Sequence, residues 1–226
     1  MAEPIVVCAL GDSITAGSPG YDPDPAERKR RGFGDDPESQ WEHWAALLDP
    51  RLEFRNRGVY GQRTDEIAAR LEACAAGADV LVVQGGINDI AQGRPVEPAA
   101  ENLRGMVRRG RELEVSVVLA DVLPWNNGWP DAEPQIRRLN ELVHELAREE
   151  GVPLLAFHDT LEDSKRPGRM REEWTAEGDH PSVAGYRRLG EGAFRLPELP
   201  WESLAKRRLC RRAALLAPRR RPQSRP

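Results

Sequence analysis

Residues Ile5–Thr15 read IVVCALGDSIT, an apolar run followed at once by a glycine and a mostly polar turn. The apolar run is far too short to span a bilayer, which takes about 20 residues. It suits a strand that is buried on both faces, as in a parallel sheet. We therefore expect a strand over Pro4–Leu10, with Ser13 just beyond its carboxyl end.

Similar apolar runs alternate with helical patterns along the rest of the chain. We expect the other strands over Leu52–Asn56, Val80–Gln84, Val115–Ala120 and Pro153–Phe157. Apolar residues recurring at intervals of three and four predict helices over Ser39–Leu48, Thr64–Ala75, Pro98–Glu112, Glu133–Glu150 and Ser182–Phe194. This alternation predicts an α/β fold, a three-layer α/β/α sandwich around a five-stranded parallel sheet. Sites in such sheets form beyond the carboxyl ends of the strands.

Composition and cysteine usage narrow the class of protein. The 226 residues are 39% hydrophobic and 31% charged, which is typical of a soluble globular domain. No secretory signal precedes the first strand, so we expect a cytoplasmic protein without a transmembrane segment. Cys8, Cys74 and Cys210 are odd in number, widely spaced and without a CxxC pair. This pattern predicts neither a disulfide framework nor a cysteine metal site, and we interpret Cys8 as a small buried residue.

The charge is unevenly distributed. Net charge is −4, but residues 201–226 carry nine basic residues against one acidic residue, which is +8 and leaves −12 for the first 200. We expect one folded domain over residues 1–200 and a disordered basic tail over 201–226. A solvated tail is favoured over a tail that binds nucleic acid or anionic lipid. Residues Ser18–Glu38 are rich in Gly, Pro and charge, and are expected to form a long surface loop.

Four polar segments should meet at one edge of the predicted sheet. Three of them follow strands, at Gly11–Thr15, Asn56–Gly61 and Gly85–Asp89, and the fourth, Glu177–Pro181, precedes the last helix. Together they supply a serine, a glycine turn, an asparagine and a histidine. An ester hydrolase needs a serine activated by a base near neutral pKa, and N–H donors for the oxyanion.

These four blocks, in this order, resemble the GDSL family of lipases and esterases, also called SGNH hydrolases. The resemblance covers roughly residues 4–195 and implies a flavodoxin-like fold that hydrolyses esters or thioesters with no cofactor or metal. Ser13 matches the nucleophile and His180 the base. The backbone N–H groups of Ser13 and Gly61 and the side chain of Asn88 match the oxyanion donors. The family usually has an aspartate three residues before the histidine, where this chain has Glu177.

The third member of the predicted triad is open between two carboxylates. A carboxylate three residues before His180 can fold back to the ring Nδ1–H, and Glu177 can do so if its longer stem retracts by about 1.5 Å. Asp179 is adjacent to the histidine, so its side chain is expected to point away from the ring. We favour Glu177, which would orient the ring and stabilise the imidazolium.

Other polar and aromatic residues have plainer interpretations. Asp12 and Asp89 are expected to accept local N–H groups in their turns. His43 is interpreted as structural, His144 as solvated, and His158 as packed, with substrate contact as the alternative. No His/Asp spacing suited to a metal is evident.

The substrate is expected to be a small molecule, acyl lipid or acyl sugar with an ester or thioester bond. Trp125 and Trp129 follow the fourth strand. They either line the substrate pocket or pack on the body of the domain. The loop Ser18–Glu38 is a candidate lid or rim. Specific nucleic-acid binding is not expected, and the oligomeric state is open.

Three alternatives remain beside ester hydrolysis. The same rim could belong to a flavodoxin-like module that binds a phosphate or flavin, but no Gly-x-x-x-x-Gly-Lys-Ser/Thr loop is present. An inactive hydrolase scaffold is compatible with Glu177 in the family's aspartate position. Acyl transfer to an alcohol would use the same residues as hydrolysis.

Overall fold

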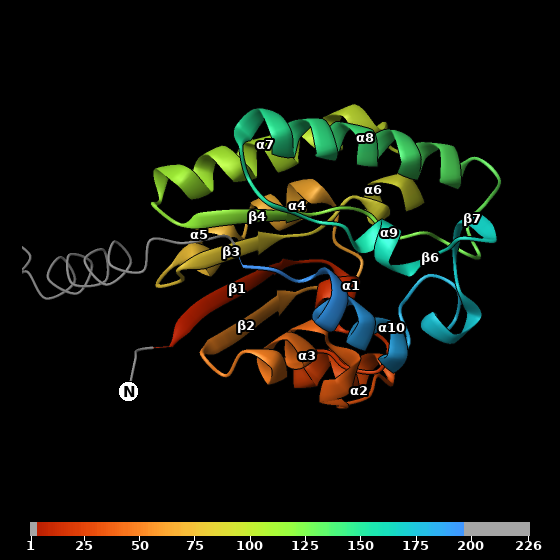
Figure 1. Ribbon diagram of the computed structural model, residues 1–226, viewed down its shortest axis with the longest axis horizontal. Helices are drawn as coiled ribbons and strands as arrows, with labels where there is room; N and C mark the ends of the chain where they lie inside the picture. Colours follow the sequence, from red (N-terminus) through yellow and green to blue (C-terminus); the bar gives the residue numbers. More distant parts are fainter. Residues whose placement is uncertain (1–3, 197–226) are drawn as a thin grey trace, which may run out of the picture. The chain divides into compact units, whose positions relative to one another are not determined.

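The computed structural model describes residues 4–196, which are built around a five-stranded parallel sheet (Figure 1). The strands lie in the order β2-β1-β3-β4-β5, and every neighbouring pair is parallel. Their bounds are β1 (Ile5–Gly11), β2 (Leu52–Gly58), β3 (Val80–Val83), β4 (Ser116–Ala120) and β5 (Leu154–Leu155). This order places the carboxyl end of β1 between those of β2 and β3, so the segments that follow these strands are neighbours.

Burial accounts for the composition of the strands. Every residue of β1 and β3 is buried, which explains why their sequences are continuously apolar rather than alternating. The edge strand β2 is buried only at its two ends, Leu52 and Gly58, and carries charged residues between them. The pairing runs in register from Ile5 opposite Leu52 to Gly11 opposite Gly58.

Helices and short elements fill the intervals between and after the strands. The helices are α1 (Ser13–Ala16), α2 (Pro25–Arg31), α3 (Trp41–Leu48), α4 (Thr64–Ala68), α5 (Leu71–Ala75), α6 (Ile87–Ala91), α7 (Val96–Glu112), α8 (Ala132–Glu150), α9 (Phe157–Leu161) and α10 (Val183–Arg188). A π-helical turn, Leu189–Ala193, continues α10, and 3₁₀ turns lie at Pro37–Ser39 and Glu172–Trp174. An antiparallel pair, β6 (Glu162–Asp163) and β7 (Arg166–Met170), follows α9.

The helices form two layers, one on each face of the sheet. Figure 1 shows α7 and α8 over one face and α3 and α10 over the other. On the first side, side chains of β1, β3 and β4 pack with those of α4, α5, α7 and α8 in one apolar cluster. On the second side, Trp41 of α3 packs its ring against Phe54, Phe157 and Phe194. The predicted three-layer α/β/α sandwich is therefore confirmed.

The predicted elements differ from the observed ones mainly where helices break. The helix expected over Thr64–Ala75 is two helices, α4 and α5, and the one expected over Ser182–Phe194 changes to π geometry after Arg188. The strand expected over Pro153–Phe157 is only two residues long, Leu154–Leu155, and α9 already begins at Phe157.

The expectation that Ser18–Glu38 is a loop is wrong for its middle third. The helix α2 begins after Asp24, whose side chain accepts the N–H of Ala26 at 2.8 Å, and Pro25 takes the first helical position. It ends at Gly32, which has a φ of 71°. These are ordinary helix start and stop signals, but α2 buries none of its residues, so no apolar periodicity reveals it.

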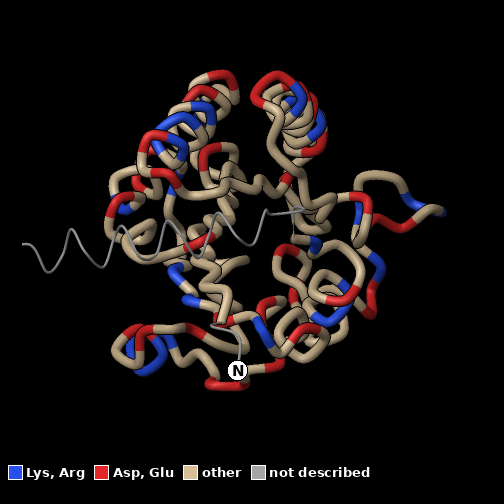
Figure 2. The backbone as a smooth tube through the Cα atoms, turned by 60° about the vertical axis from the view of Figure 1, so that its left-hand side comes forward, with Lys and Arg blue, Asp and Glu red and all other residues tan. Residues whose placement is uncertain are grey.

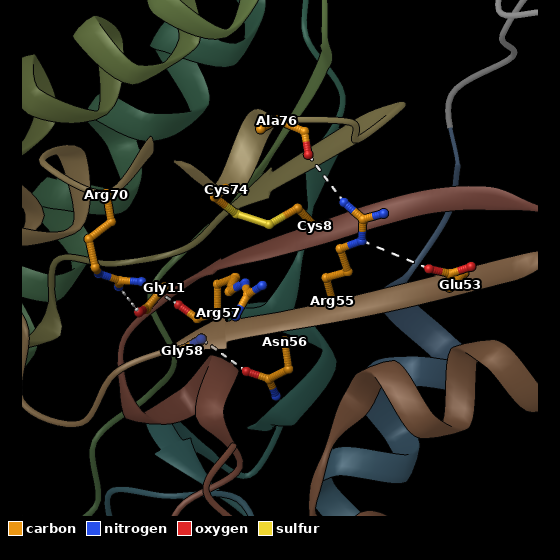
Figure 3. Close-up of a disulfide and its surroundings, with 10 residues drawn as sticks. All are labelled: Cys8, Gly11, Glu53, Arg55, Asn56, Arg57, Gly58, Arg70, Cys74 and Ala76. Carbon is orange, nitrogen blue, oxygen red and sulfur yellow. Dashed lines mark hydrogen bonds and ion pairs between the residues drawn. A yellow bond between two sulfur atoms is a disulfide. The ribbon is translucent and has the colours of Figure 1, made fainter. Parts of the chain in front are cut away.

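Cys8 and Cys74 form a disulfide between β1 and α5, with their Cα atoms 6.1 Å apart (Figure 3). The cysteine pattern predicted no disulfide framework, and the structure corrects this with one bond; Cys8 is fully buried as predicted. Cys8 and Leu10 face the same apolar cluster as Cys74, because alternate residues of a strand share a face. Disulfides persist in oxidising compartments, so the bond weighs against the predicted cytoplasmic location.

Charged residues of both signs are interleaved over the described chain (Figure 2). Many form surface ion pairs between helices, such as Arg104 with Glu149 at 2.8 Å and Arg109 with Glu72 at 2.6 Å. No helix within residues 4–196 is long and apolar enough to cross a membrane. The predicted basic tail, 201–226, lies outside the described residues, so the division at residue 200 stays a prediction.

Candidate active site

Ser13 is placed by a tight turn at the carboxyl end of β1. It is the first residue of α1 and is 5% exposed. The turn needs Gly11, because a Cβ there would lie 2.1 Å from Thr15 Oγ1 and 2.7 Å from Gln84 Oε1. Gly58, at the end of β2, lets this strand approach α1 closely, since a Cβ there would lie 2.1 Å from the Ala16 nitrogen. The serine is thereby fixed on a close-packed strand end.

Asp12 caps the helix that carries the serine. Its carboxylate accepts the Ile14 N–H at 2.9 Å, as the sequence predicts for a turn aspartate. The structure adds Gln84, at the end of β3, which donates to Asp12 Oδ2 at 3.1 Å and accepts from Thr15 Oγ1 at 2.9 Å. Burial raises the pKa of Asp12 to about 6, against the opposing effect of these N–H donors. Gln84 therefore ties the Ser13 turn to the neighbouring strand, a role that the sequence analysis missed.

A second anchor of the turn is Arg70, at the break between α4 and α5. Its guanidinium donates to the carbonyl of Gly11 at 3.0 Å and to the carbonyl of Arg57 at 2.7 Å (Figure 3). A third donor bonds Gln62 Oε1 at 2.8 Å. One side chain thus holds the last residues of β1 and β2 and the segment beside Gly61.

His180 meets Ser13 across 167 positions of sequence. Its Nε2 lies 2.9 Å from Ser13 Oγ, and the residue is 6% exposed. The loop that carries it is closed on itself, because Thr175 Oγ1 donates to the His180 carbonyl at 3.0 Å and accepts the Gly178 N–H at 2.9 Å. The Ser182 side chain then caps α10. The structure therefore brings together the two residues that the sequence placed on one rim.

Two carboxylates contact the opposite ring nitrogen of His180. Glu177 Oε1 lies 2.6 Å from Nδ1, and Asp179 Oδ1 lies 3.0 Å from the same atom. The expectation that Asp179 points away from the ring is therefore wrong. The loop is tight enough at Gly178, which has a φ of 107°, for residues on both sides of it to turn toward the ring. Sequence spacing favoured Glu177, and the structure adds Asp179 as a second partner.

These contacts set the charge of the imidazole. Burial alone would lower the pKa of His180, but the two carboxylates outweigh it and raise this pKa above the ordinary value, Asp179 more than Glu177. The hydrogen bond to His180 in turn lowers the pKa of Asp179. Distance ranks Glu177 first and electrostatic effect ranks Asp179 first. Because a hydrogen bond fixes the orientation of the ring, the nearer acceptor, Glu177 Oε1 at 2.6 Å, is the primary partner of Nδ1.

The candidate oxyanion donors lie on the segments that follow β1, β2 and β3. Within residues 4–196 the backbone N–H groups of Ser13 and Gly61 have no hydrogen-bond partner. Gly61 has a φ of 77°, a conformation that glycine adopts without strain. Asn88 Nδ2 donates to the Gln62 carbonyl at 3.0 Å, which places the amide beside the Gly61 turn.

Asp89 acts differently from the local cap that its sequence suggests. It accepts the backbone N–H of Thr64 at 2.9 Å and the Thr64 hydroxyl at 3.0 Å, so it binds α6 to the start of α4. Burial raises the pKa of Asp89, although both Thr64 bonds oppose the shift. The residue next to Asn88 is therefore held from another element, which limits the motion of the amide.

Tyr60 is a site residue that the sequence analysis missed. Its ring stacks on the His180 ring at a centroid distance of 6.1 Å and an angle of 23°. Arg31 of α2 lies 4.2 Å from the centre of the Tyr60 ring, and Phe33 packs against it at 5.3 Å. Its one signal in the sequence is its position as an aromatic residue directly before Gly61. Through Tyr60 the segment Ser18–Glu38 reaches the edge of the site.

Trp125 and Trp129 pack against each other, with ring centroids 5.0 Å apart. Their loop contacts the histidine loop, since the Asn126 N–H donates to the Gly178 carbonyl at 2.6 Å and Asn127 Nδ2 donates to the Glu177 carbonyl at 3.0 Å. Trp125 packs on the apolar core, whereas Trp129 is 39% exposed. In the described chain neither ring contacts His180, so the pair lies on a loop next to the site rather than against its reacting atoms.

Within residues 4–196, two groups of three residues bring possible metal-ligand atoms close together, although the sequence shows no His/Asp spacing suited to a metal. One is His158, Asp159 and Glu162, and the other is Glu177, Asp179 and His180. In the second group both carboxylates bond the histidine itself, which suits proton transfer.

The other histidines differ in setting: His43 packs edge-on against Trp44, while His144 is half exposed but bonds the buried Asp121 at 2.9 Å. His144 is therefore exposed, as the sequence predicts, and in addition it is held by a buried carboxylate.

Comparisons with known proteins find a family model and solved structures that are similar to this chain. A model of the GDSL-like lipase/acylhydrolase family matches residues 9–188. Similar solved structures include a lipolytic protein of the G-D-S-L family from Desulfitobacterium hafniense, 23% identical, covering 83% of this chain and 96% of that one with a TM-score of 0.69. Another is an acetyl-xylooligosaccharide esterase from Geobacillus, 18% identical, covering 84% and 92% with a TM-score of 0.65. The comparison with curated proteins finds no match. At these identities the solved structures establish a shared fold.

Proposed function

This chain belongs to the GDSL-like lipase/acylhydrolase family, and we propose that, as a carboxylic ester hydrolase, it works through an acyl-Ser13 intermediate. The observation that carries the proposal is the 2.9 Å contact between Ser13 Oγ and His180 Nε2. A serine hydroxyl becomes a useful nucleophile only when a base within hydrogen-bond reach takes its proton. Both residues are buried, which strengthens their interaction relative to water.

In the acylation step, His180 Nε2 takes the hydroxyl proton while Ser13 Oγ bonds the substrate carbonyl carbon. The carbonyl oxygen gains the negative charge, which the N–H groups of Ser13 and Gly61 and the Asn88 amide stabilise. Collapse of this intermediate breaks the bond to the alcohol or thiol, which leaves with the proton from His180. Water then attacks the acyl-serine by the same sequence, and the acid product and free Ser13 are restored.

The proposed triad acid is Glu177, with Asp179 as a second carboxylate on the same nitrogen. Glu177 Oε1, 2.6 Å from Nδ1, holds the ring in the tautomer that leaves Nε2 free to accept the serine proton. When the ring becomes an imidazolium, both carboxylates stabilise its charge. This arrangement argues against an inactive scaffold, because the glutamate in the family's aspartate position reaches the ring.

The proposed substrate is a small ester or thioester, or the ester of a lipid or sugar. Trp129 offers an exposed aromatic face on the loop that contacts Glu177 and Gly178, a surface suited to an apolar or sugar group. On the other side of His180, Tyr60 joins the site to α2 through Arg31. We propose that these two segments, Trp125–Trp129 and Ser18–Glu38, form the walls that select the substrate.

The mechanism is tested with short-chain chromogenic esters and a serine-reactive phosphonate. Wild type should turn over the esters and take one label, and Ser13→Ala should do neither. Ser164→Ala, at an exposed serine in the β6–β7 turn, is the matched control and should behave as wild type. Labelling that persists in Ser13→Ala would refute the assignment of the nucleophile.

Substrate class needs a separate panel of acyl chain lengths, thioesters and acetylated sugars. Trp129→Ala should change the ranking of substrates while leaving reaction with the phosphonate intact. An unchanged ranking would remove the tryptophan wall from the proposal. Adding an alcohol acceptor to the same assay tells hydrolysis from acyl transfer by its products.

A further inference from the structure

A polar cavity lies at the carboxyl edge of the sheet, beyond β4 and β5. It has a volume of about 240 Å³, and its walls carry two histidines, four carboxylates, one arginine and one asparagine. Asp121 directly follows β4, and His158 lies in α9 two residues after the Ala156 that ends the β5 connection. None of Ser13, Glu177 and His180 lines this cavity, so it is separate from the proposed active site.

Three of its residues come from one short stretch of chain. His158 and Asp159 lie in α9, and Glu162 begins β6. Each offers one ligand atom, and these atoms lie within 4.8 Å of one another. Glu162 directly follows the last residue of α9, so the end of this short helix keeps its side chain close to those of His158 and Asp159. Zinc binds nitrogen and oxygen ligands at about 2.0–2.2 Å, so side-chain shifts of less than about 1 Å would close the three ligands on one ion.

The surroundings of this trio hold it in place. The fully buried Asp121 accepts the backbone N–H of His158 at 2.7 Å and bonds the ring of His144 at 2.9 Å. Glu162 Oε1 accepts the Gly168 N–H at 2.6 Å, which leaves its second oxygen for another partner. Such outer contacts are what orient the ligands of a metal site.

The charge of the cavity favours a cation. Four carboxylates and one guanidinium line the cavity, and that guanidinium, of Arg137, forms an ion pair with Glu133 outside the cavity. Because an imidazole is present beside carboxylates, the set suits a transition metal such as zinc better than calcium or magnesium, which prefer oxygen ligands alone.

We propose that His158, Asp159 and Glu162 form a site for a divalent transition-metal ion, with zinc as its probe. The ion ties α9 to the start of β6, at the far end of the rim from Ser13. Since it binds the folded chain, it also raises the melting temperature.

The test is calorimetric titration of the chelator-treated full chain with zinc chloride, repeated on variants. His158→Ala and Asp159→Asn should each weaken zinc binding at least about tenfold, since even outer-shell changes typically cost 10–100-fold in affinity. Asp159 is largely exposed, so its variant keeps the result interpretable if His158→Ala is unstable. His43→Ala, at a histidine packed on Trp44, is the matched control and should bind as wild type.

His180→Ala separates this site from the other ligand cluster. The proposal is supported if zinc binding survives in His180→Ala, falls in both cavity variants and is unchanged in His43→Ala. A zinc-dependent rise in melting temperature should follow the same order. Three results would overturn it: loss of zinc binding in His180→Ala, zinc binding that persists in His158→Ala and Asp159→Asn, or no binding to wild type at millimolar zinc. Ester hydrolysis plays no part in these readouts.

Discussion

Two carboxylates on one imidazole nitrogen predict an unusual response to mutation. In a Ser-His-Asp protease, replacing the single triad aspartate by asparagine lowers kcat about 10⁴-fold. Here Glu177→Ala leaves Asp179 at 3.0 Å from Nδ1, and Asp179→Ala leaves Glu177 at 2.6 Å. We therefore expect Glu177→Ala to lower kcat/KM about tenfold and Asp179→Ala less, because each leaves one acceptor for the ring N–H.

The double variant should lose far more than the two single losses combined. With no carboxylate left, Nδ1–H has no acceptor and the imidazolium no counter-charge, so we expect a loss of about 10³–10⁴-fold. Two independent losses of at most tenfold would multiply to at most about 100-fold, or about 2.7 kcal/mol. The excess, about 1.4–2.7 kcal/mol, is the coupling energy that redundancy between Glu177 and Asp179 predicts.

The pH profile of kcat/KM gives a second readout. Hydrolysis needs neutral His180, so the rate rises with pH through the pKa of this residue in the free enzyme. The carboxylates raise that pKa, so removing either one should move the acid limb to lower pH, and removing both should move it further. A merely structural loss would lower the rate without moving the limb.

The assay is hydrolysis of a chromogenic acetate ester between about pH 5 and pH 9. Glu173→Ala, at an exposed carboxylate near the same loop, is the matched control. A full 10⁴-fold loss in Glu177→Ala alone would show that Asp179 gives no support. Loss in Asp179→Ala alone would show that Glu177 is not the acid.

Further predictions concern the oxyanion donor, the disulfide and the buried aspartate. Asn88→Ala should lower kcat about 10²–10³-fold with an unchanged melting temperature, and steady-state kinetics with an unchanged kcat would contradict its role. Reducing the Cys8–Cys74 bond, which closes a span of 66 residues, should lower the free energy of unfolding by about 2–4 kcal/mol in urea titrations, and equal midpoints with and without reductant would contradict this. Because the folded-state pKa of Asp12 is raised from 3.8 to about 6, the native state holds this proton more tightly than the unfolded chain. Stability of wild type relative to Asp12→Asn should therefore fall as pH rises from about 4 to about 6, and parallel stability curves would count against the shift.

The fold was readable from the sequence because its strands are buried on both faces. Continuous apolar runs such as Val80–Val83 occur where helices cover both faces of a strand. They indicate a parallel sheet even when the neighbouring strands are not known. The rule that sites form at carboxyl ends of strands then brought Ser13 and Asn88 to one edge. Elements that bury little, above all α2, leave no such periodic signal, although Asp24 and Gly32 mark its ends.

The parts of the site that escaped prediction depend on side-chain direction. Nothing in the order of residues says that Asp179 turns toward the ring of its neighbour, since this follows from the conformation at Gly178. The stack of Tyr60 on His180 likewise depends on how the turn before Gly61 crosses the histidine loop. Spacing predicts which residues share a rim, but the angle between two loops decides which of them touch.

The disulfide shows, inside the core, the same limit of what the sequence can predict. Strand alternation puts Cys8 and Leu10 on one face of β1, and the apolar face of α5 carries Cys74 with Leu71. Both cysteines are therefore directed into one layer by patterns that are visible in the sequence. The patterns leave open how far α5 slides along β1, and a shift of one helical turn, about 5.4 Å, would carry the sulfurs out of bonding range. Arg70 directly precedes α5 and donates to the carbonyl of Gly11, so the residue that anchors the Ser13 turn also ties the start of α5 to the strand that carries Cys8.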